Sequence, residues 1–307
     1  MPATGARTLL CNGAQQALAV AVDLVDAAGV QMLVEPITYP GILDLCRRRN
    51  ITPRAVASDE DGLLPEALER HLHALKAEGR RGAVYVMPTI HNPTTSTLPL
   101  TRRDAIVRLC RAYDAWILED DVYAPLADEG LPALAQLAPE RVFYVGSLSK
   151  IVSPGLRMGW LVVPPAFAAA AEAILASSTT TAAPLSCFLL VTWLEDRAVD
   201  TLMGALKQEA AARRALAETI FADTLPEVRI AGFHLWLPRP LPEADRLAAD
   251  AQARGLLLLP PRSFALDGTE AAGVRLCLGP PPHAELERAL RLFKRLATDA
   301  SSQRANI

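Results

Sequence analysis

The stretch "GAVYVMPTIHNPTTSTLPLTRRDAIVRLCRAYDAWILED", residues 82–120, decides the fold class. It begins and ends with short apolar runs, residues 82–88 and 115–120, which have the length and residue types of buried strands. Between them, residues 101–113 repeat apolar side chains at helical spacing. A strand, a helix and a second strand in this order indicate a mostly parallel sheet covered by helices on both faces.

The same alternation continues on both sides of this stretch. Further strands are predicted at residues 30–35 and 141–147, and further helices at 14–28 and 64–77. After about residue 180 a long helix is followed by shorter strand and helix patterns: "GFHLWLP" (232–238), a helix at 242–254, "GLLLLPP" (255–261), "GVRLCLG" (273–279) and a helix at 282–296. We therefore predict a three-layer α/β large domain at 1–182, a connecting long helix at 183–222 and a smaller α+β domain at 223–307.

Composition excludes several classes of protein. Hydrophobic residues make up 51% and charged residues 21% of the 307 residues, which is typical of a globular chain. A net charge of −3 without a basic stripe predicts no nucleic-acid binding by this chain itself. The longest apolar stretch, residues 161–176, contains two prolines and a glutamate, so no membrane span is expected.

The cysteines and histidines bear on compartment and metal content. Five cysteines are scattered without a C-x-x-C pair, which favours a reduced, cytoplasmic protein with buried thiols. The five histidines have no spacing typical of a metal site, so no metal is expected.

Polar side chains follow several of the predicted strands at the points where the strands end. Asp120 and Ser147 each close an apolar run, and Asn92 comes shortly after another. Because ligands of parallel sheets bind at the carboxyl ends of the strands, these residues are candidates for a functional site.

Lys150, in "GSLSKIVSPGLRMG" (146–159), has three interpretations. "SLSK" fits the S-x-x-K signature of penicillin-recognising enzymes, but the companion S-D-N and K-T-G elements do not occur in this sequence. A surface lysine is the ordinary alternative. The apolar and turn-rich flanks favour the third interpretation, in which a desolvated amine attacks a carbonyl.

The residues around Lys150 suit a cofactor with an aldehyde, a phosphate and a pyridine nitrogen. A carboxylate such as Asp120 would pair with the protonated pyridine nitrogen. Asn92 and Tyr123 would hydrogen-bond a ring hydroxyl, and Tyr39 would stack on the ring. The phosphate would be held by a loop that enters a helix, by hydroxyls and by an arginine, which here are Gly13, Ala14, Gln15, Ser147, Ser149 and Arg157.

Six motifs together resemble a known family. "NGAQQAL", "TYPG", "HNPTT", "EDDVYAPL", "SLSK" and "SPGLRMGW" occur in the order and spacing of fold-type I pyridoxal-phosphate enzymes of aminotransferase class I/II. The chain is most similar to the aminotransferase-like domain of MocR-type regulators, members of the GntR superfamily. Relative to that family, it is expected to lack the segment before the first glycine loop, which contributes to the small domain and to the partner subunit.

The resemblance implies a role for each matching residue. Lys150 would form the internal aldimine with pyridoxal 5'-phosphate, with Asp120 and Tyr123 as its catalytic companions. Arg275, together with Asn92, would bind the substrate α-carboxylate. The cofactor-binding set implied is Gly13, Ala14, Gln15, Tyr39, Asn92, Asp120, Tyr123, Ser147, Ser149, Lys150 and Arg157.

The implied function is transfer of an amino group between an amino acid and a 2-oxo acid by a homodimer. The alternative is an effector-sensing domain of a MocR/GntR-type transcriptional regulator, which binds the cofactor with little or no turnover. DNA binding would then require a winged-helix domain that this sequence does not contain.

Some candidate residues also have ordinary structural explanations. Asp121 competes with Asp120, although the spacing to Tyr123 favours Asp120. Arg157 could be a structural ion-pair partner, and Arg275 could be an ordinary arginine of a strand. His91 could touch the cofactor or substrate beside Asn92, or could simply order its loop. His234 is expected to pack in the core.

Overall fold

The computed structural model describes residues 5–128 and 130–302. The chain divides into two compact units, which are considered separately below. The first unit comprises Met1–Glu35, Gly41–Thr89 and Ser96–Ala205, and the second comprises Pro36–Pro40, Ile90–Thr95 and Leu206–Ile307. The expected domain boundaries at residues 182 and 222 stay a prediction.

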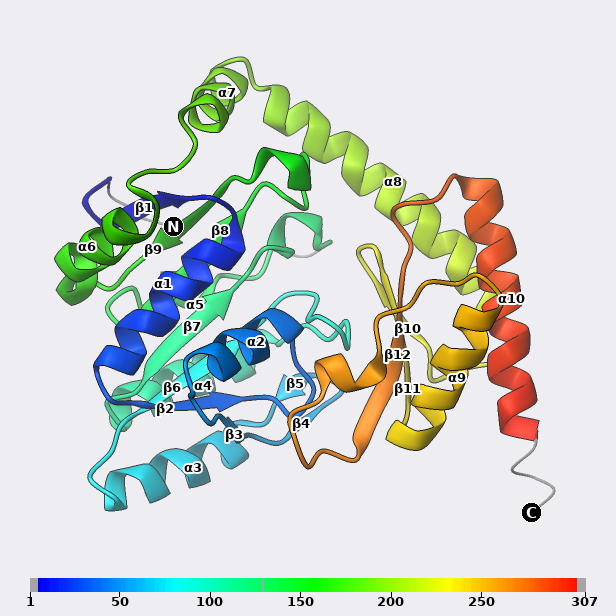
Figure 1. Cartoon of the computed structure of the whole chain (residues 1–307), viewed down its shortest axis with the longest axis horizontal. Coiled ribbons are helices and arrows are strands. Elements are labelled where there is room, and N and C mark those ends of the chain that lie inside the picture. The colour runs from blue at the N-terminus through cyan, green and yellow to red at the C-terminus, as the bar shows by residue number, and fades with distance from the viewer. Residues whose placement is uncertain (1–4, 129, 303–307) are drawn as a thin grey trace. The chain divides into compact units, whose positions relative to one another are not determined.

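A seven-stranded sheet forms the centre of the first unit (Figure 1). Its strand order is β1 (Thr8–Cys11), β9 (Gly159–Val162), β8 (Val142–Ser147), β7 (Trp116–Asp120), β6 (Gly82–Val86), β2 (Gln31–Val34) and β3 (Arg54–Ala55). Strands β8, β7, β6, β2 and β3 are parallel, whereas β9 runs antiparallel to both of its neighbours. The predicted α/β fold with a mostly parallel sheet is confirmed.

Helices cover both faces of this sheet. On one face, α1 (Ala14–Ala27) packs on β7, β8 and β9 and against α6 (Ala168–Thr179). The opposite face carries α3 (Pro65–Ala77), α4 (Leu100–Ala112) and α5 (Leu134–Leu137), whose apolar side chains join those of the strands in one buried cluster. In α3 the buried residues Leu68, Leu72 and Leu75 recur at helical spacing, which is why this amphipathic sequence forms a surface helix.

The first unit also contains shorter elements. The two-stranded pair β4 (Ser58–Asp59) and β5 (Gly62–Leu63) comes directly before α3. The side-chain amide of Gln15 in α1 donates to the carbonyl of Gly41 in α2 (Pro40–Arg48) over 3.2 Å. Strands β1 and β9 and helices α2 and α6 were not predicted, because they are short or carry no clear apolar period.

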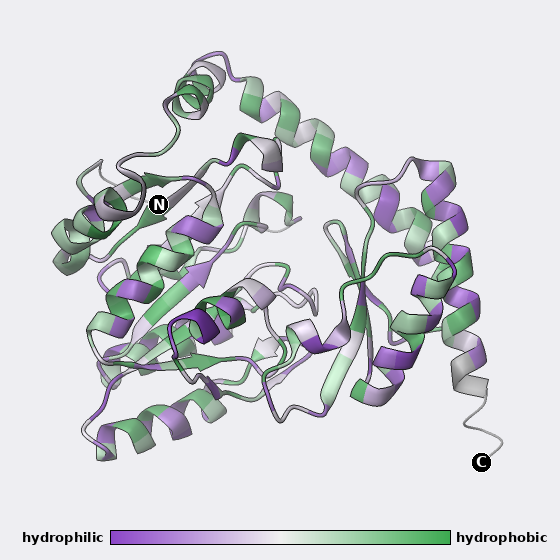
Figure 2. Cartoon of the chain, viewed as in Figure 1, coloured by the Kyte–Doolittle hydropathy of each residue, from purple (hydrophilic) through white to green (hydrophobic). Residues whose placement is uncertain are grey.

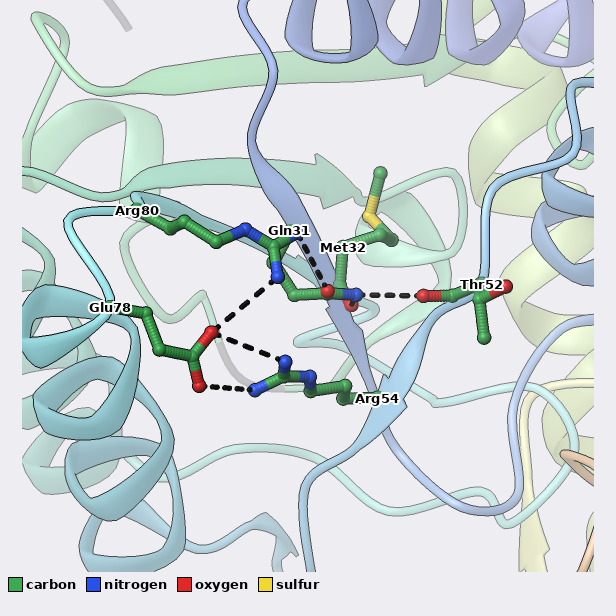
Figure 3. A network of polar contacts seen from close by, with 6 residues as sticks. All are labelled: Gln31, Met32, Thr52, Arg54, Glu78 and Arg80. Atoms are coloured by element: carbon green, nitrogen blue, oxygen red, sulfur yellow. Dashed lines mark hydrogen bonds and ion pairs between the residues drawn. The ribbon is translucent and has the colours of Figure 1, made fainter.

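A polar network links the amino-terminal ends of neighbouring strands of the sheet (Figure 3). The side-chain amide of Gln31, at the start of β2, donates to the carbonyl of Thr52 over 2.7 Å and accepts from Arg80 over 3.1 Å. Glu78 pairs with Arg80 and also with Arg54 at the start of β3. These contacts join β2, β3 and the end of α3 at the edge opposite the candidate residues Asp120 and Ser147.

The stretch predicted as one long helix, residues 183–222, forms two helices. These are α7 (Pro184–Glu195) and α8 (Ala198–Phe221), and Arg197 between them has a φ of 55°. A left-handed residue interrupts the helical hydrogen-bond ladder, so the chain changes direction there. Among the described residues, no helix combines the length and the apolar composition needed to cross a membrane.

The second unit contains a three-stranded antiparallel sheet with order β10 (Arg229–Ala231), β11 (His234–Pro240) and β12 (Ala271–Cys277). Helices α9 (Leu241–Ala253) and α10 (His283–Ser302) share one buried apolar cluster with this sheet, which agrees with the expected α+β organisation. The "GLLLLPP" run is not a strand. Leu256 and Leu258 pack against the cluster while Leu257 is 88% exposed, and the two following prolines cannot donate to a sheet ladder.

Candidate functional site

The acidic run Glu119–Asp121 lies at the carboxyl end of β7, and strand geometry separates its members. The Glu119 carboxylate accepts hydrogen bonds from the backbone N–H groups of Leu134 and Ala135 in α5, at 2.7 and 2.8 Å. Successive strand residues point to opposite faces, so Asp120 faces the α1 side of the sheet. Pleating therefore assigns different surroundings to three adjacent carboxylates.

Asp120 is buried, and its two carboxylate oxygens differ in their partners. Oδ2 accepts a hydrogen bond from the hydroxyl of Tyr85 in β6 over 2.9 Å. Oδ1 is buried without a hydrogen-bond partner among residues 5–128 and 130–302. Burial raises the pKa of Asp120 to about 6, while the bond from Tyr85 and the nearby charge of Lys150 oppose that rise. An orphaned buried oxygen of this kind suits a cationic ring nitrogen.

The other two carboxylates belong to a structural network around Arg103, whose side chain in α4 is fully buried. Its guanidinium donates to the carbonyls of Leu98, Pro132 and Pro88 and to the Thr89 hydroxyl, over 2.8–3.1 Å. Burial raises the pKa values of Glu119 and Asp121, and the positive charge of Arg103 opposes that rise. Asp121 lies with Thr89 and Arg103, although its Oδ1 also has no hydrogen-bond partner among the described residues. Asp120 is the candidate for a ligand because it lies near Lys150.

Lys150 lies near Tyr123 and Asp120. Its Nζ is 5.5 Å from the centroid of the Tyr123 ring, and the Tyr123 side chain is buried. The flanking Leu148 and Ile151 are buried, whereas Lys150 itself is exposed. The expectation that the apolar flanks would desolvate Lys150 is therefore wrong: the flanking side chains are buried, whereas Lys150 is exposed.

The loop before α1 lies beside the ends of β8 and β9. Cys11 pairs with Gly159, and Gly159 pairs with Ser147, so the end of β1 and Ser147 lie on either side of Gly159. Gly13 has a φ of 87°, and a Cβ atom there would lie 2.5 Å from an Nη atom of Arg157. The guanidinium of Arg157, which donates to the Asn12 carbonyl over 3.3 Å, thus lies directly against the loop.

Hydroxyl and N–H donors lie beside Arg157 and the loop before α1, and together they form one corner of the first unit. The Ser147 hydroxyl donates to the carbonyl of Met158 and lies 3.0 Å from the Ser149 hydroxyl. Ala14 and Gln15 form the first turn of α1, where backbone N–H groups have no acceptor within the helix. Hydroxyls, helix-terminal N–H groups and an arginine are the donors that bind phosphate.

Gly159→Ala is expected to disturb this corner strongly. The new Cβ would lie 2.6 Å from the backbone N of Ala14 and from the backbone carbon of Gly13, so the loop would have to move. We expect a loss of about 1–3 kcal/mol in unfolding free energy, measured by urea denaturation. Gly155→Ala is the matched control, because its Cβ would meet only the Ser153 hydroxyl at 3.4 Å. Equal stability of the two variants would contradict the close approach.

The second unit holds three of the predicted site residues. Arg275 in β12 donates from Nη1 to the Asn92 side-chain oxygen over 2.7 Å, and its guanidinium carbon lies 5.0 Å from the Phe264 ring centroid. Tyr39 is half-buried in the same unit.

His91 is buried with Nδ1 2.8 Å from the Thr94 hydroxyl, which fits a role in ordering its loop. His234 is buried in β11, as expected for a packed residue.

Two residues of the first unit, Tyr85 and Arg103, were missed by the sequence analysis. Tyr85 pairs with Leu118 across β6 and β7 and therefore shares a face with Asp120, but this register follows from strand pairing and is not visible in the sequence. Arg103 could have been found from helical spacing, because Ile106, Val107 and Cys110 follow it on the same face of α4.

Comparison with known proteins gives consistent similarities. The family model described as aminotransferase class I and II matches residues 3–293. Over 295 residues the chain is 28% identical to the uncharacterized HTH-type transcriptional regulator YdeF of Bacillus subtilis, covering 95% of this chain and 63% of that relative. The chain thus matches less than two thirds of YdeF.

Solved structures show the same fold. An archaeal alanine:glyoxylate aminotransferase superposes with a TM-score of 0.89 at 21% identity, over 97% of this chain and 76% of that one. The kynurenine aminotransferase of Pyrococcus horikoshii, solved in complex with PMP, gives a TM-score of 0.85 at 22% identity, over 97% and 75%.

Proposed function

Because the chain belongs to the aminotransferase class I and II family, we propose that it binds pyridoxal 5'-phosphate at Lys150 and transfers amino groups between amino acids and 2-oxo acids. The observation that carries this proposal is the buried, unpartnered Oδ1 of Asp120 near Lys150. A buried carboxylate oxygen without a hydrogen-bond partner among the described residues, close to the proposed attachment point, suits a positively charged ring nitrogen.

The residues of the first unit fit the cofactor. The face of β7 that carries Asp120 offers a carboxylate for the pyridine nitrogen. The corner formed by Gly13, Ser147 and Arg157 offers donors for a phosphate, and a side chain at position 13 would meet the arginine. PMP in a solved neighbour of the same fold also supports this cofactor class.

Each residue would make a separate contribution. When bound, pyridoxal phosphate supplies a carbonyl that condenses with amines and a ring that withdraws electrons from the amino acid Cα. The Lys150 amine would hold the cofactor and later accept and return the Cα proton. Asp120 would keep the ring nitrogen protonated, and Arg157 with the α1 N–H groups would hold the phosphate.

The remaining roles are also proposals. For Tyr39, Asn92 and Arg275, which belong to the second unit, the cofactor and carboxylate roles implied by the resemblance stay predictions. A cytoplasmic location is supported by five free cysteines, three of them buried.

A homodimer is supported by the surface of α7. This helix exposes Leu185, Phe188, Val191 and Leu194, all more than half accessible, and Figure 2 shows it as mostly hydrophobic. Patches of this kind mark interaction surfaces. Sedimentation of the cofactor-bound chain as a monomer would contradict the proposal.

The test of the proposed activity is direct. Purified protein with added pyridoxal phosphate should show a visible absorption band, and a panel of amino acids with 2-oxoglutarate should yield the paired products. A protein that never acquires the band, although it is folded by circular dichroism, would refute cofactor binding at Lys150.

The similarity to YdeF favours a second candidate function, a cofactor-binding sensor domain of a transcriptional regulator with little turnover. Rapid formation of 2-oxo acid products would exclude it. A visible band that responds to an amino acid or amine without product formation would support it.

A further inference from the structure

Tyr85 lies in the middle of the sheet, next to the carboxylate that the proposed function assigns to the cofactor ring. It is 1% exposed and belongs to β6, where it pairs with Leu118 of β7. Leu118 and Asp120 are two residues apart on one strand, so the Tyr85 and Asp120 side chains share a face. The hydroxyl reaches Oδ2 of Asp120 at 2.9 Å.

This single bond makes the two carboxylate oxygens inequivalent. With Oδ2 engaged by Tyr85, rotation of the carboxylate is restricted, and Oδ1 is the oxygen left without a partner among the described residues. A hydrogen bond from a neutral donor is stronger to an ionised carboxylate than to a protonated one, so the same contact favours the charged form.

We propose that Tyr85 is a positioning residue that holds Oδ2 of Asp120, so that Oδ1 alone meets the pyridine nitrogen of the cofactor. This inference rests on the proposed function, since it assumes that Asp120 faces that nitrogen. Tyr85 itself needs no contact with the cofactor.

The hydrogen bond from Tyr85 has a large effect on the pKa of Asp120, because few other groups near the carboxylate lower that pKa. From β6 comes the Tyr85 hydroxyl, and from the end of β8 comes the charge of Lys150; both lower the pKa of Asp120, against the larger effect of burial. Asp121 raises that pKa, and the backbone N–H of Val122 lowers it. The α1 side chains buried on this face are apolar. Loss of the hydroxyl should therefore raise the pKa of Asp120 further above its value of about 6.

Tyr85→Phe removes the hydroxyl and keeps the ring, so the sheet should remain packed. We expect the dissociation constant of pyridoxal phosphate at neutral pH to increase about tenfold, the lower end of the effect of a hydrogen bond to a charged group. The pH below which cofactor binding weakens should move upward. Both quantities are read from the visible band during titration of cofactor-free protein.

Tyr144→Phe is the matched control. Tyr144 lies on strand β8 beside β7, and burial together with the negative charges of Glu119, Asp120 and Asp121 raises its pKa. Within the described residues it makes no hydrogen bond to Asp120. It should leave the dissociation constant and the pH midpoint unchanged. In an Asp120→Asn background, Tyr85→Phe should have little further effect on cofactor affinity, which a merely structural role of Tyr85 would not produce.

A cofactor-free measurement separates this inference from the proposed function. Carbon-13 NMR of aspartate carboxyls, assigned with Asp120→Asn, should show the Asp120 titration shifted upward in Tyr85→Phe and unshifted in Tyr144→Phe. If wild-type protein binds cofactor but Tyr85→Phe matches it in affinity and in the Asp120 titration, the inference is overturned and the proposed function stands. If wild-type protein binds no cofactor, the proposed function fails, and the inference about the ring nitrogen fails with it.

Discussion

Lys150→Ala protein should lose the visible absorption band that bound pyridoxal phosphate gives the wild type, and its turnover should fall by at least about 10²–10⁴-fold. The substitution removes the amine that would hold the cofactor carbonyl and move the Cα proton. Absorption spectra of the reconstituted proteins and product formation from an amino acid and 2-oxoglutarate measure the two effects.

Lys76→Ala is a close control for this experiment. The Nζ of Lys76 lies 5.6 Å from the centroid of the Tyr113 ring, almost the geometry of Lys150 over Tyr123 at 5.5 Å, but on the far end of α3. Its replacement should leave band and turnover unchanged. A band that survives in Lys150→Ala, or disappears equally in Lys76→Ala, would show that Lys150 is not the attachment point.

Arg103→Met is expected to have the largest effect on stability. The variant leaves the buried carboxylates of Glu119 and Asp121 without their cation, and removes the donor for three carbonyls and the Thr89 hydroxyl. Removing one partner of a buried charge network costs about 3–5 kcal/mol of unfolding free energy. Urea denaturation monitored by circular dichroism measures this loss.

The pH dependence of that loss has a definite sign. Both carboxyl pKa values are raised in the fold by burial, so ionising these groups destabilises the folded state as the pH rises through the raised values. Without Arg103 this penalty grows, and the stability difference from wild type should be larger in alkaline than in acidic solution. Arg108→Met, on the exposed side of the same helix, should change stability by less than about 0.5 kcal/mol at either pH. A pH-independent difference would mean that Arg103 acts only as a hydrogen-bond donor.

Local sequence patterns were sufficient to predict much of the fold. The strands β2, β6, β7 and β8 and the helices α1, α3 and α4 lie within two residues of their predicted ranges, because each buries a regular apolar face. The pattern failed where local sequence does not determine the outcome. Arg197 interrupts the predicted long helix, and "GLLLLPP" has an apolar strand composition but pairs with no strand in the described part of the chain.

For the candidate site, the sequence by itself determined which chemical groups the chain offers: the amine of Lys150, the carboxylate of Asp120, the glycine loop, and the order of the motifs that identify the family. The tertiary structure decided the different surroundings of the three adjacent carboxylates: Glu119 is held by α5, Asp121 lies with Thr89 and Arg103, and Asp120 lies with Tyr85 and near Lys150. It also decided that Lys150 is exposed and that Tyr85 reaches Asp120. Hydrogen bonds and burial between distant segments depend on which strands are neighbours, and strand order is a property of the whole sheet rather than of any local stretch.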